Sequence, residues 1–198
     1  MIKAIVMSFQ STPAFNIMAL LKDLELRTRV PKDHVGWIYG YVTKAKPRLA
    51  KFPKGYMLNQ LCKLGTTLNG TIPFRFWFDE YDTYTDESGC SNNENGYECE
   101  NEYMYQLCEL KNELKKLCLT CDEVEKYGNG KDLYALHIKK LEIFDKPMEL
   151  GEFYKGFGTW EECDVGYKWV MNGKVIGILP LTKAPQSYQY VYVNEVEE

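Results

Sequence analysis

The sequence predicts an α+β domain, namely a small, mostly antiparallel β-barrel with peripheral helices and an acidic insertion. Three observations lead to this fold class. The chain has five or six segments rich in β-branched and aromatic residues, one clear early helix, and few of the strand–helix–strand units that a parallel sheet requires. At 198 residues, 45% of them hydrophobic, a single domain over 1–198 can bury a core without disulfides or metal.

The first thirty residues predict a strand, a helix and a second strand. Residues 2–9 are apolar and β-branched, which favours a strand. Ser11, Thr12 and Pro13 then predict a helix that begins with a hydroxyl cap and a proline in its first turn. Residues 24–29 alternate between apolar and charged side chains, a pattern typical of a strand.

Two further strands are expected before the middle of the chain. Residues 35–43 are aromatic and β-branched, and a basic loop over 44–55 follows them. Asn69 and Gly70 predict a tight turn. The turn leads into 71–84, the most strand-like segment of the sequence.

The composition changes abruptly after this strand. Residues 83–102 are dominated by Ser, Asn, Gly, Glu and Asp, so we interpret them as a solvated insertion. Added helices are expected over 103–127, the second of them capped by Thr120 with Glu123 in a capping box.

The last third predicts two strands and a helical turn. Residues 132–144 and 187–193 have the composition of strands, and 148–154 that of a short helical turn.

Two features bear on where the protein works. The opening segment favours a strand over a signal peptide, and no apolar run approaches the roughly 20 residues of a membrane-spanning helix. Seven cysteines, an odd number, without a secretory signal favour free thiols. We therefore expect a cytoplasmic protein with no membrane contact.

Charge is distributed unevenly along the chain. Residues 1–75 contain twelve Lys/Arg against three Asp/Glu, a net +9, whereas 76–125 contain three Lys against fourteen Asp/Glu, a net −11. Residues 126–198 have a net charge of −2. The basic third indicates a nucleic-acid-binding face, and the alternative is that the two blocks neutralise each other in the fold.

Six segments in order carry a resemblance to a known family. They read KAIVMSFQ, LLKDLELRT, GWIYGYVTKAKP, NGTIPFRFWFDEY, KDLYALHIKKLEIFDKPMELGEFY and LTKAPQSYQYV. Together they resemble the ASCH domain family of the PUA-like superfamily, in the version often found in bacteriophages. The resemblance implies one ASCH/PUA-like barrel that binds RNA or a modified nucleobase or nucleoside, in the host cytoplasm if a phage encodes it.

The family signature has a lysine, a glutamate and an arginine after the first helix. It falls here on Lys22, Glu25 and Arg27, with Leu20 replacing the family's glycine and Asp23 its threonine. The resemblance implies that Lys22 and Glu25 are catalytic and that Arg27 binds the nucleobase. An enzyme of the wider family is an amidohydrolase of an acylated cytidine, so the alternative function is hydrolysis of N-acylated nucleobases.

Strand geometry supports two of these residues independently. If 24–29 form a strand, Glu25 and Arg27 project to one side, where a carboxylate and a guanidinium can bind an amide edge. A surface ion pair of small energy, about 0–1 kcal/mol, is the alternative that the spacing leaves open.

The resemblance adds further nucleobase-binding residues at the barrel opening. They are His137, Gln186, Ser187 and Tyr188, the last in place of the family's tryptophan. For two of them a structural role is the alternative to nucleobase binding. Tyr188 would then pack in the core, and His137 would be a half-buried residue that makes a hydrogen bond.

We expect these residues to form one pocket. Glu25 and Arg27 should pair across it, His137 and Tyr188 should line it, and Lys22 should lie at its lip.

The basic loop supplies candidate phosphate contacts. Lys44, Lys46 and Arg48 lie within twelve residues that are rich in lysine and proline, and each phosphate contact would add salt dependence. An ordinary solvated loop is the alternative.

Other partners and cofactors follow from the remaining patterns. The acidic segment 79–125 can imitate a phosphate backbone, so a third hypothesis is a phage-encoded inhibitor that contacts a host defence nuclease. We expect no cofactor, because the sequence has no phosphate-binding motif. We expect no metal, because it has no zinc-protease motif and contains only two histidines and one C-x-x-C pair, too few ligands for a zinc site.

Overall fold

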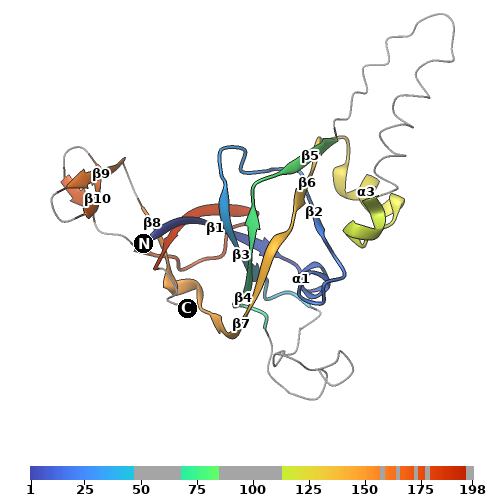
Figure 1. Ribbon diagram of the computed structural model, residues 1–198, viewed down its shortest axis with the longest axis horizontal. Coiled ribbons are helices and arrows are strands. Elements are labelled where there is room, and N and C mark those ends of the chain that lie inside the picture. Colours follow the sequence, from blue (N-terminus) through green and yellow to red (C-terminus); the bar gives the residue numbers. More distant parts are fainter. Residues whose placement is uncertain are drawn as a thin grey trace, which may run out of the picture.

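The largest sheet in the described part of the chain has seven strands and is mixed (Figure 1). The computed structural model describes residues 1–46, 68–84, 113–156, 159–163, 166–171, 174–176 and 179–194. In spatial order the sheet contains β12 (Leu179–Pro180), β8 (Phe153–Lys155), β13 (Tyr188–Val193), β1 (Ile2–Phe9), β3 (Gly36–Val42), β4 (Ile72–Phe78) and β7 (Lys139–Met148). Within it only β1 and β3 pair in parallel, so the expected antiparallel character is confirmed.

Two three-stranded sheets accompany the large one. The first has the order β2 (Leu24–Arg27), β6 (Leu133–His137) and β5 (Tyr81–Tyr84). The second has the order β11 (Lys174–Ile176), β10 (Gly166–Met171) and β9 (Thr159–Cys163), in a region where the sequence predicted no strands.

Short helices connect these sheets. α1 (Ser11–Met18) follows β1, and α3 (Cys121–Gly128) precedes β6. η2 (Leu150–Glu152) lies within the helical turn expected over 148–154, whose last two residues belong to β8 instead. Residues 113–117 are also helical. The N-cap of α1 is Gln10 and makes no side-chain cap hydrogen bond, so the expected hydroxyl cap is wrong.

The predicted capping box of α3 is confirmed. The backbone N–H of Thr120 donates to Glu123 Oε2 at 2.8 Å, and the backbone N–H of Glu123 donates to Thr120 Oγ1 at 3.3 Å. These reciprocal bonds satisfy amide groups that a helix start leaves without intrahelical acceptors.

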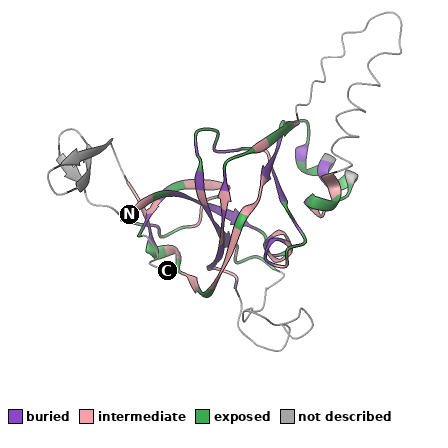
Figure 2. Cartoon of the chain, viewed as in Figure 1, coloured by how far each residue is buried: buried purple, intermediate pink, exposed green. Residues whose placement is uncertain are grey.

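The core lies on both faces of β1. Ile5, Met7 and Phe9 pack toward α1 and β6, whereas Ala4 and Val6 pack toward the opposite cluster. This alternation follows from the two-residue period of a strand, and it leaves most of β1 buried (Figure 2). A third cluster joins the outer face of the β2–β6–β5 sheet to α3 and residues 114–119.

A closed barrel is not present in the described residues, because the large sheet ends at β12 on one side and β7 on the other. The difference arises in the segment 132–144, which was predicted as one strand. The chain breaks after His137, so that β6 joins the small sheet and β7 the large one. Lys140, at a φ of 46°, lies where β4 and β7 shift register.

Acidification should destabilise the fold through His34. Its ring is buried, stacked 6.4 Å from Phe78 between centroids, and burial together with the charge of Lys3 lowers the pKa of the imidazole below 6.5. The pKa of His34 is thus lower in the folded chain than the value of 6.5 in the unfolded chain, and between these two values the unfolded chain binds more protons. The contribution of neutral His34 to the free energy of unfolding is therefore fully present above pH 6.5 and is lost as the pH falls through the folded-state pKa. Urea unfolding above and below that pH should show a shallower pH dependence for His34→Phe than for the wild type, and equal slopes would contradict this assignment.

Candidate functional site

A pocket of about 600 Å³ opens where β1 ends and the crossover to β3 begins. Residues of β1, the start of α1, the loop before β2 and β2 itself converge there. The pocket is lined by Ser8, Gln10, Pro13, Lys22, Glu25, Leu26, Arg27, Thr43, Ala45, Leu119, Glu123, Tyr127 and Gln186. The three signature residues therefore share one pocket.

Lys22, Glu25 and Arg27 form a buried row of charges along this pocket. Lys22 Nζ lies 3.4 Å from Glu25 Oε2, and Arg27 Nε lies 2.9 Å from Glu25 Oε1. The side chains are 4%, 7% and 11% exposed, respectively. The expected pairing of Glu25 with Arg27 is present, whereas Lys22 is buried and not at the lip of the pocket.

The β-strand pleat explains why Glu25 and Arg27 act together. In the β2–β6 register they face Leu136 and Tyr134, two residues of the core between the sheets. Side chains two residues apart share a face of the strand, so both charges point inward. Their burial in turn requires that they neutralise each other.

The end of β1 fixes the guanidinium of Arg27. Its Nη2 donates to the carbonyl oxygen of Ser8 at 2.8 Å, and the guanidinium carbon lies 4.7 Å from the centroid of the Phe9 ring. A cation–π contact of this kind adds about 0.5–2 kcal/mol when it is sheltered from water. Arg27 is thus held by a carboxylate, a carbonyl and an aromatic face.

Ser8 also tethers the segment that carries Gln186. The Ser8 hydroxyl donates to the carbonyl of Pro185 at 2.6 Å, and its backbone N–H donates to the carbonyl of Ser187 at 2.9 Å. Gln186 lies between these two anchors and lines the pocket. Its amide offers donors and an acceptor there.

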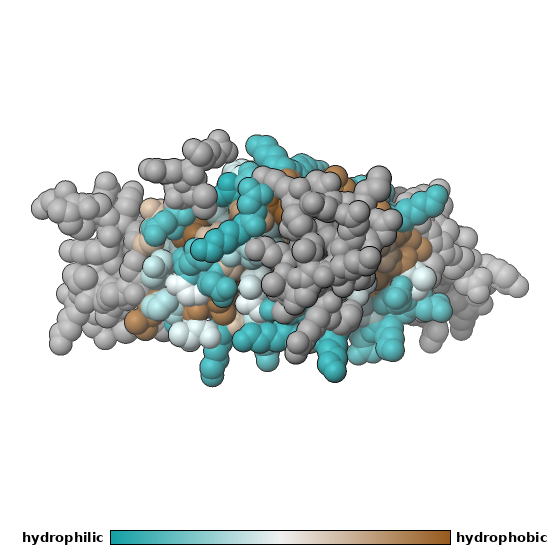
Figure 3. Space-filling view, turned by 90° about the horizontal axis from the view of Figure 1, so that it is seen from below, coloured by the Kyte–Doolittle hydropathy of each residue, from teal (hydrophilic) through white to brown (hydrophobic). Residues whose placement is uncertain are grey.

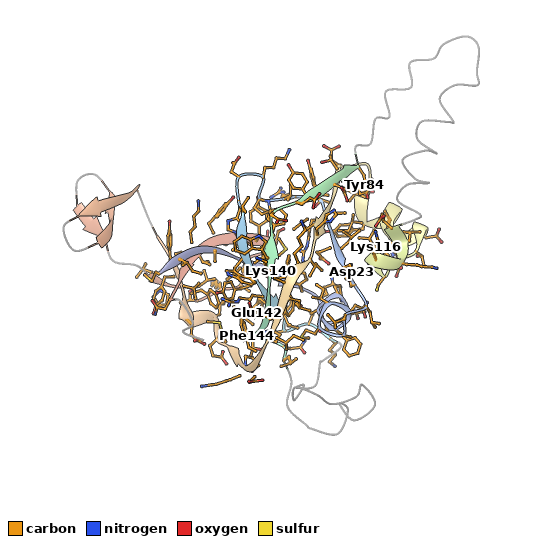
Figure 4. The ribbon with its side chains drawn as sticks, viewed as in Figure 1. Asp23, Tyr84, Lys116, Lys140, Glu142 and Phe144 are labelled. Carbon is orange, nitrogen blue, oxygen red and sulfur yellow. The ribbon has the colours of Figure 1, made fainter. Side chains whose placement is uncertain are left out.

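The loop before β2 is bonded to the helical segment that precedes α3. Lys22 Nζ donates to the carbonyl of Leu117 at 2.6 Å, and Cys118 Sγ donates to the carbonyl of Leu21 at 2.8 Å. The Asp23 N–H donates to the carbonyl of Lys116 at 3.0 Å, and Figure 4 shows these two residues on facing segments. The segment 116–118, just before α3, therefore fixes the position of the Lys22 ammonium.

The charged side chains that line the pocket balance each other, with Lys22 and Arg27 against Glu25 and Glu123. Additional positive charge near the pocket comes from the exposed Lys44 and Lys46, on either side of Ala45, which lines the pocket. This arrangement attracts anionic groups toward the opening.

Two buried atoms of pocket residues make no hydrogen bond within the described part of the chain, namely Arg27 Nε and Thr43 Oγ1. The Arg27 Nε contact with Glu25 is therefore an ion pair whose N–H is poorly directed at the carboxylate. Buried polar groups usually find a partner, and water or a ligand often provides it.

His137 and Tyr188, expected in the pocket, do not line it. His137 pairs across β2 with Leu24, so the pleat directs it to the face opposite that of Glu25, where its Nε2 lies 2.8 Å from Asp82 Oδ2. The Tyr188 ring packs against the core, and its hydroxyl donates to the carbonyl of Val30 at 3.3 Å. Both have the structural environments that were the alternatives to nucleobase contact.

Some predicted residues remain outside the described chain. Arg48 and most of the acidic segment 79–125 lie there, so their roles stay predictions. In the described part of that segment, Asp79 and Glu80 pair with Lys139. The charge of these two carboxylates is therefore partly neutralised by Lys139 of β7.

Several pocket residues were not predicted from the sequence. Ser8 is the last residue but one of β1, and Thr43 directly follows β3. Glu123 and Tyr127 come from α3, and Leu119 lies just before it. Position at the carboxyl ends of two parallel strands was a usable signal for the first two, but the parallel pairing was not foreseen. No sequence signal places α3 beside β2.

The face in Figure 3 shows hydrophilic side chains around smaller hydrophobic areas. Within the described ranges, no helix has the length and apolar character needed to cross a membrane. The same residues contain no group of three or more His, Cys, Asp or Glu placed to hold a metal ion.

Comparison with known proteins identifies the fold. No protein-family model matches the chain, and no curated protein matches its sequence. A solved structure of a serine-to-alanine variant of the ASCH protein from Zymomonas mobilis is similar, with a TM-score of 0.53 and 11% identity over 96% of this chain and 88% of that one. Two others of the ASCH protein from the same organism have TM-scores of 0.48 (11% identity, 96% and 87% of the chains) and 0.44 (13% identity, 74% and 76%). The chain therefore has the fold of an ASCH protein.

Proposed function

We propose that this protein is a binding module for RNA or a modified nucleobase, of the ASCH/PUA-like type. The observation that carries the proposal is the buried Lys22–Glu25–Arg27 row along the pocket. The volume of the pocket lies within the range of small-molecule sites, about 300–1,000 Å³, so the pocket is large enough to hold a nucleobase.

The polar groups of the pocket match the edge of a base. Glu25 accepts contacts from two cations, yet a carboxylate has about four lone-pair sites, so it retains acceptor capacity for an amino group. Gln186 adds an amide that can donate and accept. In this proposal Lys44 and Lys46, exposed on either side of the pocket residue Ala45, contact the phosphates of a strand whose base occupies the pocket.

The geometry favours binding over amide hydrolysis. Lys22 Nζ faces a carbonyl and a carboxylate, both acceptors, which is the environment of a hydrogen-bond donor. The catalytic assignment of Lys22 and Glu25 remains a prediction. Release of acid from N-acylated nucleosides by the wild type, and loss of that release in Lys22→Ala, would support it.

The replacement Arg27→Lys should weaken ligand binding by about tenfold or more. Lysine keeps the charge but cannot reproduce the planar guanidinium that contacts Glu25, Ser8 and the Phe9 ring together. Titration with short single-stranded RNA and with a panel of plain and N-acylated nucleosides, at low and high salt, measures the effect. RNA affinity should fall steeply with salt because phosphate contacts release counterions.

A matched control is available two residues along the chain. Arg29 is exposed and does not line the pocket, so Arg29→Lys should leave affinity unchanged. Absence of wild-type binding to every RNA and nucleoside, even at low salt, would overturn the proposed function. Equal losses in Arg27→Lys and Arg29→Lys would place the site elsewhere.

A further inference from the structure

One wall of the pocket comes from α3 and from Leu119, just before it. Leu119, Glu123 and Tyr127 line the pocket, and Tyr127 is 45% exposed. A single exposed aromatic residue on a protein surface is ordinary. This one borders a pocket whose other side is polar and charged.

The helix geometry explains why the Tyr127 ring faces the pocket. Val124 and Gly128 are one helical turn apart and buried, Val124 in the cluster that α3 forms with β2 and β6. Glu123 and Tyr127 are also one turn apart and line the pocket on the neighbouring face. α3 thus has one face for the core and one for the pocket.

On that second face Glu123 is committed to the helix cap. Its Oε2 accepts hydrogen bonds from the N–H and the hydroxyl of Thr120 at 2.8 and 3.0 Å. Tyr127 has no comparable structural task among the interactions of the described residues. Its aromatic ring is therefore available to a planar group that occupies the pocket.

The segment just before α3 is anchored beside the charged row. Lys22 Nζ donates to the carbonyl of Leu117, and Cys118 Sγ donates to the carbonyl of Leu21. The segment that leads into α3 is therefore bonded to the loop that carries Lys22. This anchoring brings the start of α3, and with it Tyr127, to the same pocket as the charged row.

We propose that Tyr127 is the stacking residue of this site and that the ligand it selects has a planar aromatic ring, as a nucleobase does. Tyr127 would thus be the aromatic residue that contacts the base, the contact that the resemblance implied for Tyr188. The inference rests on the proposed function and adds the residue and the ligand feature that α3 recognises. Aromatic stacking on a base is typically worth 1–3 kcal/mol, which corresponds to roughly 5- to 150-fold in affinity.

The test compares four proteins with one RNA probe. A short single-stranded RNA carrying 2-aminopurine, whose fluorescence falls when it stacks on an aromatic ring, is titrated into wild type, Tyr127→Phe, Tyr127→Leu and Tyr190→Leu. Tyr190 is 38% exposed and does not line the pocket, so it controls for loss of a surface tyrosine. Circular dichroism and thermal melts establish that each variant folds.

The expected result is wild-type affinity and quenching for Tyr127→Phe and Tyr190→Leu. Tyr127→Leu should bind roughly 5- to 150-fold more weakly and lose the quenching. Unchanged binding and quenching in Tyr127→Leu, with the wild type binding normally, would overturn the stacking role and leave the proposed function intact. No binding by the wild type would instead overturn the proposed function and the stacking role with it.

Discussion

Replacing Glu25 with alanine should lower the free energy of unfolding by about 3–5 kcal/mol. The substitution leaves the ammonium of Lys22 and the guanidinium of Arg27 buried without the carboxylate that lies between them. Breaking a buried ion pair costs this much because an uncompensated charge remains in a medium of low dielectric constant. Chemical denaturation of the wild type and the variant measures the difference.

Two controls separate stability from function at this site. Glu142 pairs with Arg75 but is 40% exposed, so Glu142→Ala should cost less. The triple variant Lys22→Met, Glu25→Leu, Arg27→Met removes all three charges together and should recover most of the lost stability while ligand binding stays abolished. A loss below about 1 kcal/mol in Glu25→Ala would contradict the dependence of the two cations on Glu25.

Gly40→Ala should destabilise the protein by about 3 kcal/mol, the upper part of the range for overpacked cores. Gly40 pairs with Phe74 across β3 and β4, and a Cβ atom on Gly40 would fall against the Phe74 ring. The ring cannot withdraw easily, because it is fully buried and packs edge-on against Phe9 with centroids 5.5 Å apart. Thermal and urea unfolding measure the effect.

A double variant tests the cause of this loss. Gly40→Ala with Phe74→Leu should be more stable than the sum of the single changes predicts, since the smaller side chain leaves room for the new methyl group. Gly151→Ala is the control, because a Cβ there meets nothing within 4 Å and stability should change by less than about 0.5 kcal/mol. Additive effects of the two core substitutions would show that contact with the Phe74 ring is not the cause.

The locally encoded parts of the structure could be predicted from the sequence. The strand β1, the strand β2 and the capping box of α3 depend on periodicity and on residues three or four positions apart. The same holds for the pairing of Glu25 with Arg27, whose two-residue spacing determines that they share a face once the strand forms.

The remaining features depend on contacts between distant segments. The split of 132–144 into β6 and β7 is decided by which sheet each half joins, and the periodicity of the segment does not contain that information. The same holds for His137, whose face is determined by its register with Leu24. Tyr127 was missed because α3 reaches the pocket only through its packing on β2 and β6.

The pairing of β1 with β13 has a consequence for folding kinetics. Ile2 lies opposite Val193, and Ser8 is bonded to residues 185 and 187, so the central strand closes a loop of nearly the whole chain. Contacts of such sequence separation slow folding, because loop entropy is lost before the contacts form. During synthesis the backbone N–H and C=O groups on this edge of β1 lack their β13 partners until β13 has emerged from the ribosome, and the pocket is not complete before then.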